Sequence, residues 1–406
     1  MRRMFIVSVL ALMSVLPLGA RQQTLRLDYV FSGTDTETLI ALDGIGSLDF
    51  WAGRHVNMDI VPVAGNGQLT LKSVPDGNLL YMTSFSTLFQ EWQTTEEATR
   101  VRKSFENVFF APMPEGKAEV TVTLFDFHGG VKASMTHTVD PADILIRPGG
   151  QHPETFEYLW QGGSVEDCID VAVVAEGYTA EETELFMNDA REAMDALFSH
   201  EPFATYKDRF NILAVPLVSE ESGVSIPHEG VWKSTAVGSS FDTFYTERYL
   251  TTLRLRSLHD RLAGIPYEHL IILANTETYG GGGIYNSYTL TTAHHEAFKP
   301  VVVHEFGHSF GALADEYYYD DQYSEYYYPD TEPWEKNITT MKDFSSKWKS
   351  MMGNDGVSLY EGGGYQSTGV WRGAEDCRMK TNTSEGFCPV CRAAIEDMIR
   401  YYTEQR

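Results

Sequence analysis

Two histidines four residues apart constrain this chain most, because side chains at that spacing share one face of a helix. His304, Glu305 and His308 lie in the segment KPVVVHEFGHSFG, residues 299–311. Pro300 suits the first turn of a helix, and the three valines before His304 indicate that the helix is buried. Two imidazole nitrogens on one face can bind a single Zn²⁺. Glu305 can act as the general base on a zinc-bound water, which the metal makes acidic.

The same pattern also arises by chance on surface helices, so its surroundings decide between the two interpretations. Here the motif lies in an apolar stretch, follows a predicted strand and ends at Gly311. These three features favour a metal site.

A third ligand is expected shortly after the motif. Gly311 lets the chain leave the helix and turn back towards the metal. Metzincin-type sites take their third ligand three residues after such a glycine, and that position is Ala314, which cannot bind zinc. Asp315 and Glu316 follow at once, and a carboxylate is a legitimate zinc ligand. We expect Asp315, which needs the smaller displacement from that spacing, with Glu316 as the alternative. The carboxylate that does not bind could orient a ligand histidine.

The chain has 406 residues, which fits two domains. Residues 24–140 contain short stretches with alternating apolar residues, separated by Gly, Pro, Asn and Asp. This pattern predicts an N-terminal β-sandwich domain over residues 21–145. Residues 141–153 have the composition of a linker.

Residues 153–406 predict an α/β catalytic domain with a mostly parallel sheet. A capping box at Thr179–Glu182 starts one predicted helix. The other elements we expect are strands near residues 169–173, 212–218 and 270–273 and a helix over about 241–262.

The first twenty residues predict a signal peptide. Arg2 and Arg3 precede an apolar run, and small residues follow it at Gly19 and Ala20. We therefore expect export to the periplasm or out of the cell. No later segment is apolar for long enough to insert stably in a membrane. The net charge of −26 argues against nucleic acid as a partner. Oligomeric state cannot be read from the sequence.

Four cysteines are present, and three lie close together near the C-terminus: Cys168, Cys377, Cys388 and Cys391. In an exported protein we favour a disulfide near the C-terminus, although the sequence does not select the pairing. The alternative is a structural zinc site in which Cys377 and Cys168 complete the pair Cys388 and Cys391.

Three further segments allow more than one interpretation. The glycine-rich stretch 280–288 is equally compatible with an edge strand that pairs with substrate and with a flexible loop. Residues 315–330, rich in Tyr, Asp and Glu, favour a solvated acidic loop over a calcium site or an aromatic wall of a cleft. His294 and His295 are expected at an exposed helix cap rather than on the metal.

The chain resembles the M64 metallopeptidases, often labelled IgA peptidases. The resemblance lies in residues 304–311, in LADEY (313–317), in DCRMK (376–380) and in FCPVC (387–391). It covers roughly residues 150–406, and the N-terminal part looks like the β domain that accompanies such peptidases.

The resemblance implies a metzincin-like fold, one catalytic zinc and hydrolysis of peptide bonds. By position it implies His304, His308 and Asp315 as ligands, Glu305 as the base and Met379 as the methionine in a tight turn under the metal. No residue pattern indicates immunoglobulin A as the substrate.

We therefore expect an exported zinc metalloendopeptidase that acts on protein or peptide substrates. The alternatives are a zinc amidase for cell-wall or small amide substrates, and a catalytically inactive binding or adhesion protein. An intact Glu305 argues against the last.

Overall fold

The computed structural model describes residues 22–320 and 326–406. The predicted signal peptide, residues 1–20, lies outside the described residues and stays a prediction, as do the domain boundaries. Among the helices that are described, none has both the length and the apolar character needed to cross a membrane.

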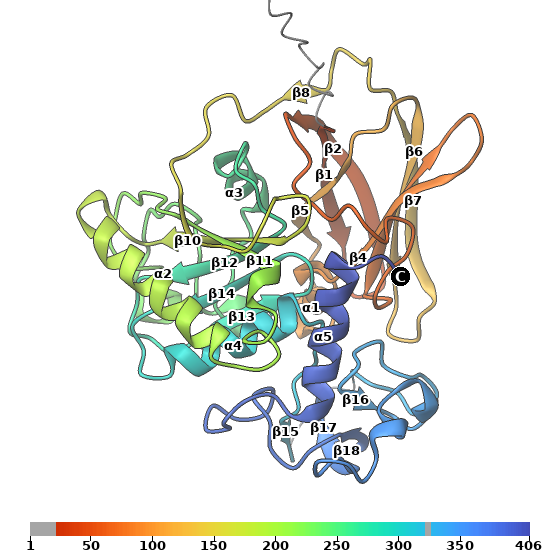
Figure 1. Cartoon of the computed structure of the whole chain (residues 1–406), viewed down its shortest axis with the longest axis vertical. Coiled ribbons are helices and arrows are strands. Elements are labelled where there is room, and N and C mark those ends of the chain that lie inside the picture. The colour runs from red at the N-terminus through yellow and green to blue at the C-terminus, as the bar shows by residue number, and fades with distance from the viewer. Residues whose placement is uncertain (1–21, 321–325) are drawn as a thin grey trace, which may run out of the picture.

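Two four-stranded sheets form the N-terminal part (Figure 1). One has the order β5-β1-β2-β8 and consists of β1 (Thr24–Gly33), β2 (Thr38–Leu48), β5 (Lys103–Pro112) and β8 (Arg147–Pro148). The other has the order β4-β3-β6-β7 and consists of β3 (Gly67–Ser73), β4 (Leu79–Phe85), β6 (Ala118–Phe125) and β7 (Val131–Val139).

Alternating apolar residues hold these two sheets face to face. In β6, Ala118, Val120, Val122 and Leu124 are all fully buried, as their period of two predicts. Across the interface the rings of Phe85 and Phe109 have centroids 4.3 Å apart. The expectation of a separate all-β N-terminal part is confirmed.

A six-stranded mixed sheet organises the C-terminal part, with the order β13-β14-β12-β10-β11-β9. Its strands are β9 (Glu157–Gln161), β10 (Ile169–Glu176), β11 (Phe210–Val215), β12 (His269–Ala274), β13 (Gly281–Ile284) and β14 (Tyr288–Thr292). The four inner strands are parallel, and the edge strands β13 and β9 run antiparallel to their neighbours. The predicted strands and their mostly parallel arrangement are confirmed.

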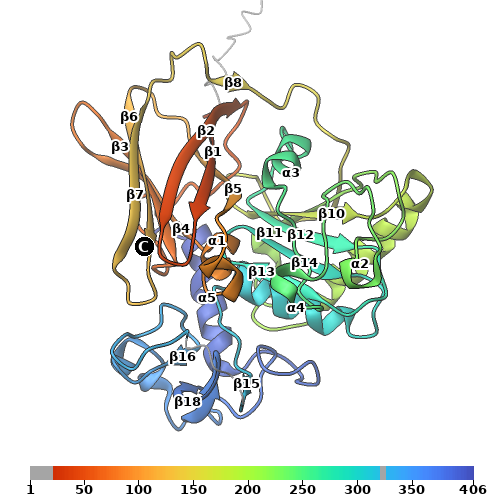
Figure 2. The same ribbon diagram turned by 180° about the vertical axis from the view of Figure 1, so that it is seen from behind.

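Helices cover one face of this sheet (Figure 2). They are α2 (Thr183–Phe198), α4 (Phe298–Ser309) and α5 (Pro389–Thr403). Val171 and Val173 of β10 point into that layer, whereas Ala172 and Val174 join the core that continues into the N-terminal sheets. The predicted capping box is present just before α2, with Thr179 and Glu182 bonded reciprocally.

The predicted helix over residues 241–262 is wrong for its first half. Only α3 (Leu255–Arg261) is α-helical; a single 3₁₀ turn lies at Thr243–Tyr245, and Asp242, Phe244 and Tyr245 all have positive φ. The Asp242 carboxylate accepts a hydrogen bond from the backbone N–H of His228, 3.0 Å away. The backbone here pairs with other segments instead, since Ser240 and Thr251 exchange hydrogen bonds and Tyr249 forms a bridge with Gly281. This tertiary pairing overrides the helix propensity of the segment and explains the error.

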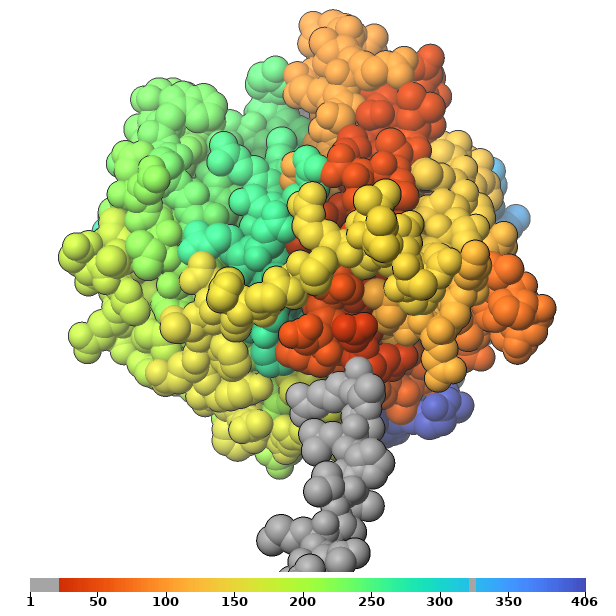
Figure 3. Space-filling model, turned by 90° about the horizontal axis from the view of Figure 1, so that it is seen from above, coloured from red at the N-terminus to blue at the C-terminus, as the bar shows by residue number. Residues whose placement is uncertain are grey.

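The two parts of the chain are joined closely. The segment between β7 and β9, yellow in Figure 3, runs over the surface from the N-terminal sheets to the C-terminal part. Helix α5 packs on the loop after β2, where Asn57 donates to the carbonyl of Tyr401 at 2.7 Å and Arg54 lies over the Tyr401 ring. A third small sheet follows α4 and contains β15 (Tyr318–Tyr319), β16 (Ile338–Thr339), β17 (Tyr360–Gly363) and β18 (Tyr365–Arg372).

Helix α4 lies unusually close to the edge strand β13. A Cβ atom at Gly283 would lie 2.3 Å from the carbonyl oxygen of Glu305 and 2.8 Å from the Cβ of His308. Backbone cannot move aside as a flexible side chain does, so only glycine fits at this position.

Gly283→Ala is therefore expected to lower the free energy of unfolding by about 1–3 kcal/mol, the usual cost of overpacking. Gly44→Ala in β2 is the matched control, since a Cβ there meets no atom within 4 Å, and it should change stability by less than about 1 kcal/mol. Urea unfolding of the metal-free variants measures both values. Equal effects from the two substitutions would contradict the close approach of α4 to β13.

Candidate metal centre

Both histidines of the motif project from α4 with their rings fixed by backbone carbonyls. The Nδ1 atom of His304 lies 2.9 Å from the carbonyl oxygen of Arg378, and the Nδ1 atom of His308 lies 2.6 Å from that of Leu313. A carbonyl only accepts, so each Nδ1 carries the proton and each Nε2 presents a lone pair. The two Nε2 atoms lie 3.1 Å apart.

Asp315 brings a carboxylate to the same point. Its Oδ1 lies 3.1 Å from the Nε2 of His304 and 3.2 Å from the Nε2 of His308. The chain reaches this position through a tight turn in which Ala312, with φ of 53°, takes the left-handed conformation expected of Gly311. Gly311 is needed for space instead, since a Cβ there would lie 2.6 Å from the carbonyl oxygen of Gly307.

These three atoms fit a bound cation. With both Nδ1 atoms donating to carbonyls, the two Nε2 atoms and Asp315 Oδ1 are all acceptors, and Oδ1 is buried without a hydrogen-bond donor. Buried acceptors that face one another are destabilising unless something positive lies between them. Two imidazoles and one carboxylate form a donor set that suits Zn²⁺ and leaves a coordination position open.

The electrostatics of the group agree with that reading. Burial opposes a charge on His308, but the Asp315 carboxylate outweighs it and raises the pKa of His308 to about 9. Burial likewise opposes the charge on Asp315, yet the two histidines hold the pKa of this carboxyl far below its ordinary value. The site therefore favours a positive charge at the point where the three side chains meet.

Asp315 is held by residues that the sequence did not single out. Tyr365, which begins β18, donates its hydroxyl to Asp315 Oδ2. Asn337 bonds both the N–H and the C=O of Ala314, at 2.9 and 2.8 Å. No signal in the sequence marks either residue, because both lie more than twenty positions downstream and are brought in by the third sheet.

Glu316, the alternative ligand, lies elsewhere. Its Oε1 is 3.0 Å from the sulfur of Cys391 and 3.0 Å from the amide nitrogen of Asn337. Successive residues of an extended chain point to opposite sides, and the structure therefore brings Asp315, and not Glu316, to the histidines.

Glu305 lies one residue after His304 and faces the edge strand. A Cβ at Gly281 would lie 2.8 Å from its Oε1, so the carboxylate rests against the glycine backbone. Burial away from water raises the pKa of Glu305, and this effect outweighs the lowering of the pKa by His304 and His308. A carboxyl group with a raised pKa beside a metal site is suited to taking up and releasing a proton.

Met379 packs against the helix that carries the two histidines. The residue is fully buried in a tight turn closed by the hydrogen bond from Lys380 N to Cys377 O, 2.8 Å long. Its sulfur packs against α4 at Gly307, where a Cβ would lie 2.6 Å from it.

An open cleft runs over these residues, with an empty volume of about 3150 Å³ including open solvent. Its walls come from both parts of the chain and include Asn66 and Phe127 of the N-terminal sheets and Gly281 of β13. The space in it that water can enter is about 1040 Å³, at the upper end of the roughly 300–1,000 Å³ of typical small-molecule pockets.

The glycine-rich segment 280–288 contains a strand at the sheet edge, so the flexible-loop interpretation is wrong for β13. Part of its outer edge is already covered, because Tyr249 forms a bridge with Gly281. The Tyr249 hydroxyl donates to Glu91 of α1 (Leu88–Trp92) in the N-terminal part, where burial raises the pKa of Glu91 to about 7.

Some of the aromatic side chains after Asp315 form a wall of the cleft, whereas residues 318–320 and 329–330 are exposed, as expected of a solvated loop. Tyr317 and Tyr326 each pack edge-to-face on Tyr365, with ring centroids 5.3 and 5.6 Å apart, and all three line the cleft. Residues 321–325 lie outside the described part.

His294 is not at an exposed helix cap, since its Nε2 lies 2.9 Å from the Asp189 carboxylate on α2.

Comparison with known proteins gives two matches. Residues 158–359 match the family described as IgA Peptidase M64, and residues 19–136 match the Peptidase M64 N-terminus. No curated protein matches the chain. Because the two matches together span most of the chain and the first includes His304, Glu305 and His308, the chain belongs to peptidase family M64 and is a peptidase.

Proposed function

We propose that the protein is an exported zinc-dependent endopeptidase that cleaves extended segments of protein substrates. One observation carries this proposal: His304, His308 and Asp315 converge beside Glu305 at the floor of a long open cleft. His304, His308 and Asp315 would hold the Zn²⁺. When bound, zinc supplies Lewis-acid polarisation and makes water acidic near neutral pH.

The residues of the chain account for the remaining steps. Glu305 accepts a proton from the attacking water and delivers it to the amine that leaves. The carbonyls of Arg378 and Leu313 keep the two imidazoles in one tautomer and orientation. Tyr365 fixes the second oxygen of Asp315, so that Oδ1 keeps facing the histidines.

The layout around the site supports a metzincin-like fold. The motif helix packs under a sheet whose edge strand β13 runs antiparallel, a tight turn follows α4 and leads to a carboxylate, and a buried methionine lies in a turn beneath the helix. The segments that form this arrangement extend from Gly281 in β13 to Met379.

An open cleft favours a polypeptide over a small amide, since a small substrate needs an enclosing pocket. This argues against the amidase alternative. The intact Glu305 beside three converging ligand groups argues against an inactive binding protein. Export rests on the pattern of residues 1–20 alone.

Glu305→Gln is expected to abolish cleavage while zinc binding and stability are retained, because the amide keeps the shape of the side chain but does not accept the proton. General-base loss typically costs about 10²–10⁴-fold in rate. The mature wild type and the variant, both loaded with zinc, are incubated with a mixed peptide library, and new termini are read by mass spectrometry. Glu361→Gln on β17 serves as the control.

Internal cleavages by the wild type and the control, absent with Glu305→Gln, support an endopeptidase. Removal of terminal residues only would contradict it, and cleavage that persists in Glu305→Gln would remove Glu305 from its role.

Asp315→Ala is expected to weaken zinc binding at this centre by more than about 100-fold, because it removes a direct ligand. Tyr365→Phe leaves all three ligands and should cost about 10–100-fold, as is usual for a partner that orients a ligand. Zinc retained after dialysis against graded chelator concentrations gives both values, with the exposed Asp330→Ala as the control. If Asp315→Ala bound zinc like the wild type, the assigned ligand set would be wrong.

A further inference from the structure

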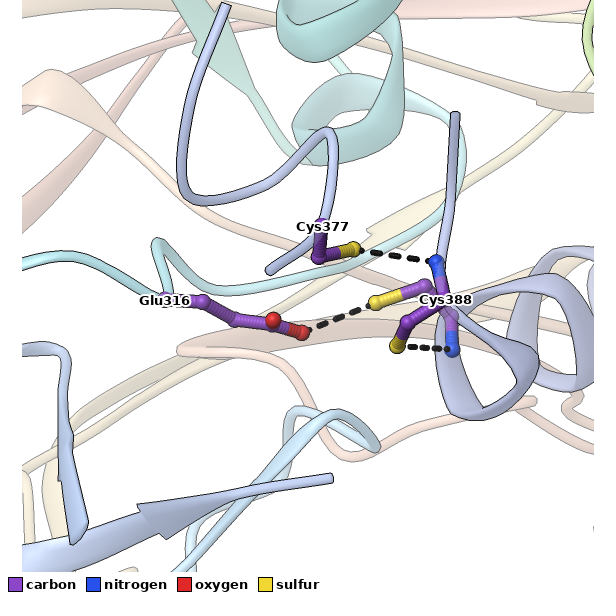
Figure 4. A group of neighbouring side chains, drawn as sticks. Glu316, Cys377 and Cys388 are labelled. Atoms are coloured by element: carbon purple, nitrogen blue, oxygen red, sulfur yellow. Dashed lines mark hydrogen bonds between the residues drawn. The ribbon is translucent and has the colours of Figure 1, made fainter. Parts of the chain in front are cut away.

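A second group of side chains that could hold a metal gathers at the start of α5 (Figure 4). It contains Glu316, Cys377, Cys388 and Cys391, and their ligand atoms all lie within 4.8 Å of one another. All four residues are buried, with Glu316, Cys377 and Cys391 fully so. Four ligands with no open position are the arrangement of a structural zinc site.

The backbone around the sulfurs is arranged for negative charge. The N–H of Cys388 points at the sulfur of Cys377, 3.2 Å away, and the N–H of Cys391 points at the sulfur of Cys388, 3.5 Å away. Cys388 also caps the N-terminus of the fifteen-residue helix α5, whose dipole stabilises a thiolate there.

Glu316 supplies an independent observation. Its carboxylate is fully buried, and Oε2 has no hydrogen-bond partner within the described residues. None of the hydrogen bonds of the buried arginines Arg372 and Arg378 reaches Glu316: their terminal nitrogens bond backbone carbonyls such as those of Gly362, Asn382 and Ser384, and their Nε atoms have no partner within the described residues. A buried carboxylate oxygen with no donor calls for a cation within reach.

A disulfide explains this group less well. Three sulfurs gather at one point, so one disulfide would leave a thiol over and would not satisfy Glu316. Cys168 does not contribute, because its sulfur lies near the carbonyl of Asp208 in the segment before β11, and all four cysteines are free in the structure. The favoured disulfide is therefore absent from the structure, and Glu316 takes the place that the zinc alternative gave to Cys168.

We propose that Cys377, Cys388, Cys391 and Glu316 bind a second Zn²⁺, which is structural. Three thiolates and one carboxylate suit zinc, whereas calcium and magnesium prefer oxygen ligands alone. Bound metal also keeps the three neighbouring thiols from oxidising in an exported protein.

The second metal holds the two loops that build the first centre. Glu316 follows Asp315 directly, and its N–H donates to the carbonyl of Met379 at 2.8 Å. Cys377 precedes Arg378, whose carbonyl orients His304. The structural site thus connects the loop that carries Asp315 to the loop whose Arg378 carbonyl orients His304. This role does not depend on the identity of the substrate.

Metal content tests the proposal without an activity assay. The mature protein is stripped with chelator, reloaded with Zn²⁺, desalted and analysed by plasma mass spectrometry. We expect two zinc ions per chain in the wild type, one in His308→Ala, one in Cys391→Ser, and two in Cys168→Ser, the matched cysteine control. Circular dichroism establishes that each variant is folded. One zinc in the wild type and none in His308→Ala would overturn the second site but leave the first intact.

A second measurement does not require a cysteine variant to fold. In His308→Ala loaded with Co²⁺, the thiolates should give an intense near-ultraviolet charge-transfer band, which a site of nitrogen and oxygen ligands lacks. Alkylation in denaturant with chelator and no reductant should then label all four cysteines. A Cys377–Cys388, Cys377–Cys391 or Cys388–Cys391 disulfide in the mass spectrum, or no thiolate band, would overturn the proposal.

Discussion

Two backbone carbonyls decide what the first centre can hold. By accepting the Nδ1 protons of His304 and His308, the carbonyls of Arg378 and Leu313 leave both Nε2 atoms as bare acceptors 3.1 Å apart. Asp315 adds a third acceptor whose Oδ1 is buried without a donor. Without a cation these atoms repel one another, so the surrounding packing must hold the group together.

That packing depends on close backbone approach more than on large side chains. Glycines 281, 283 and 307 let β13 and the Met379 turn lie directly against α4, where a Cβ at any of them would come within 2.3 to 2.8 Å of another atom. A rigid helix held between an edge strand and a turn keeps the two imidazoles fixed. Preorganised ligands lose little entropy when a metal binds, which favours tight binding.

The sequence predicted what periodicity and local spacing encode. The helix with His304 and His308, the capping box before α2 and the alternating strands of the N-terminal sheets depend on neighbours within a few residues. Asp315 was reached by spacing, although the residue that turns the chain is Ala312 and not Gly311. The helix expected over residues 241–262 is absent before Leu255 because the backbone there pairs with other segments, as at Tyr249 and Gly281.

What the sequence could not predict depends on contacts between distant segments. Tyr365 reaches Asp315 across fifty positions, Asn337 holds the loop at Ala314, and Glu316 joins cysteines more than sixty positions away. None of these residues lies in a pattern that differs from ordinary core or surface residues. Cys377, Cys388 and Cys391 could be grouped from the sequence, but Glu316 as the fourth member of the group required the fold.

The N-terminal sheets are part of the cleft and not an appended module. Glu91 accepts a hydrogen bond from the hydroxyl of Tyr249, the residue that covers part of β13. Asn66 accepts one from the indole N–H of Trp334 at 2.8 Å, and both of these residues line the cleft. One apolar core also continues from the two N-terminal sheets into the C-terminal sheet. Under the proposed function, a peptide lying in the cleft contacts both parts at once. Residues of the N-terminal sheets then help to select the substrate, whereas the bond-breaking groups all come from residues 304–315.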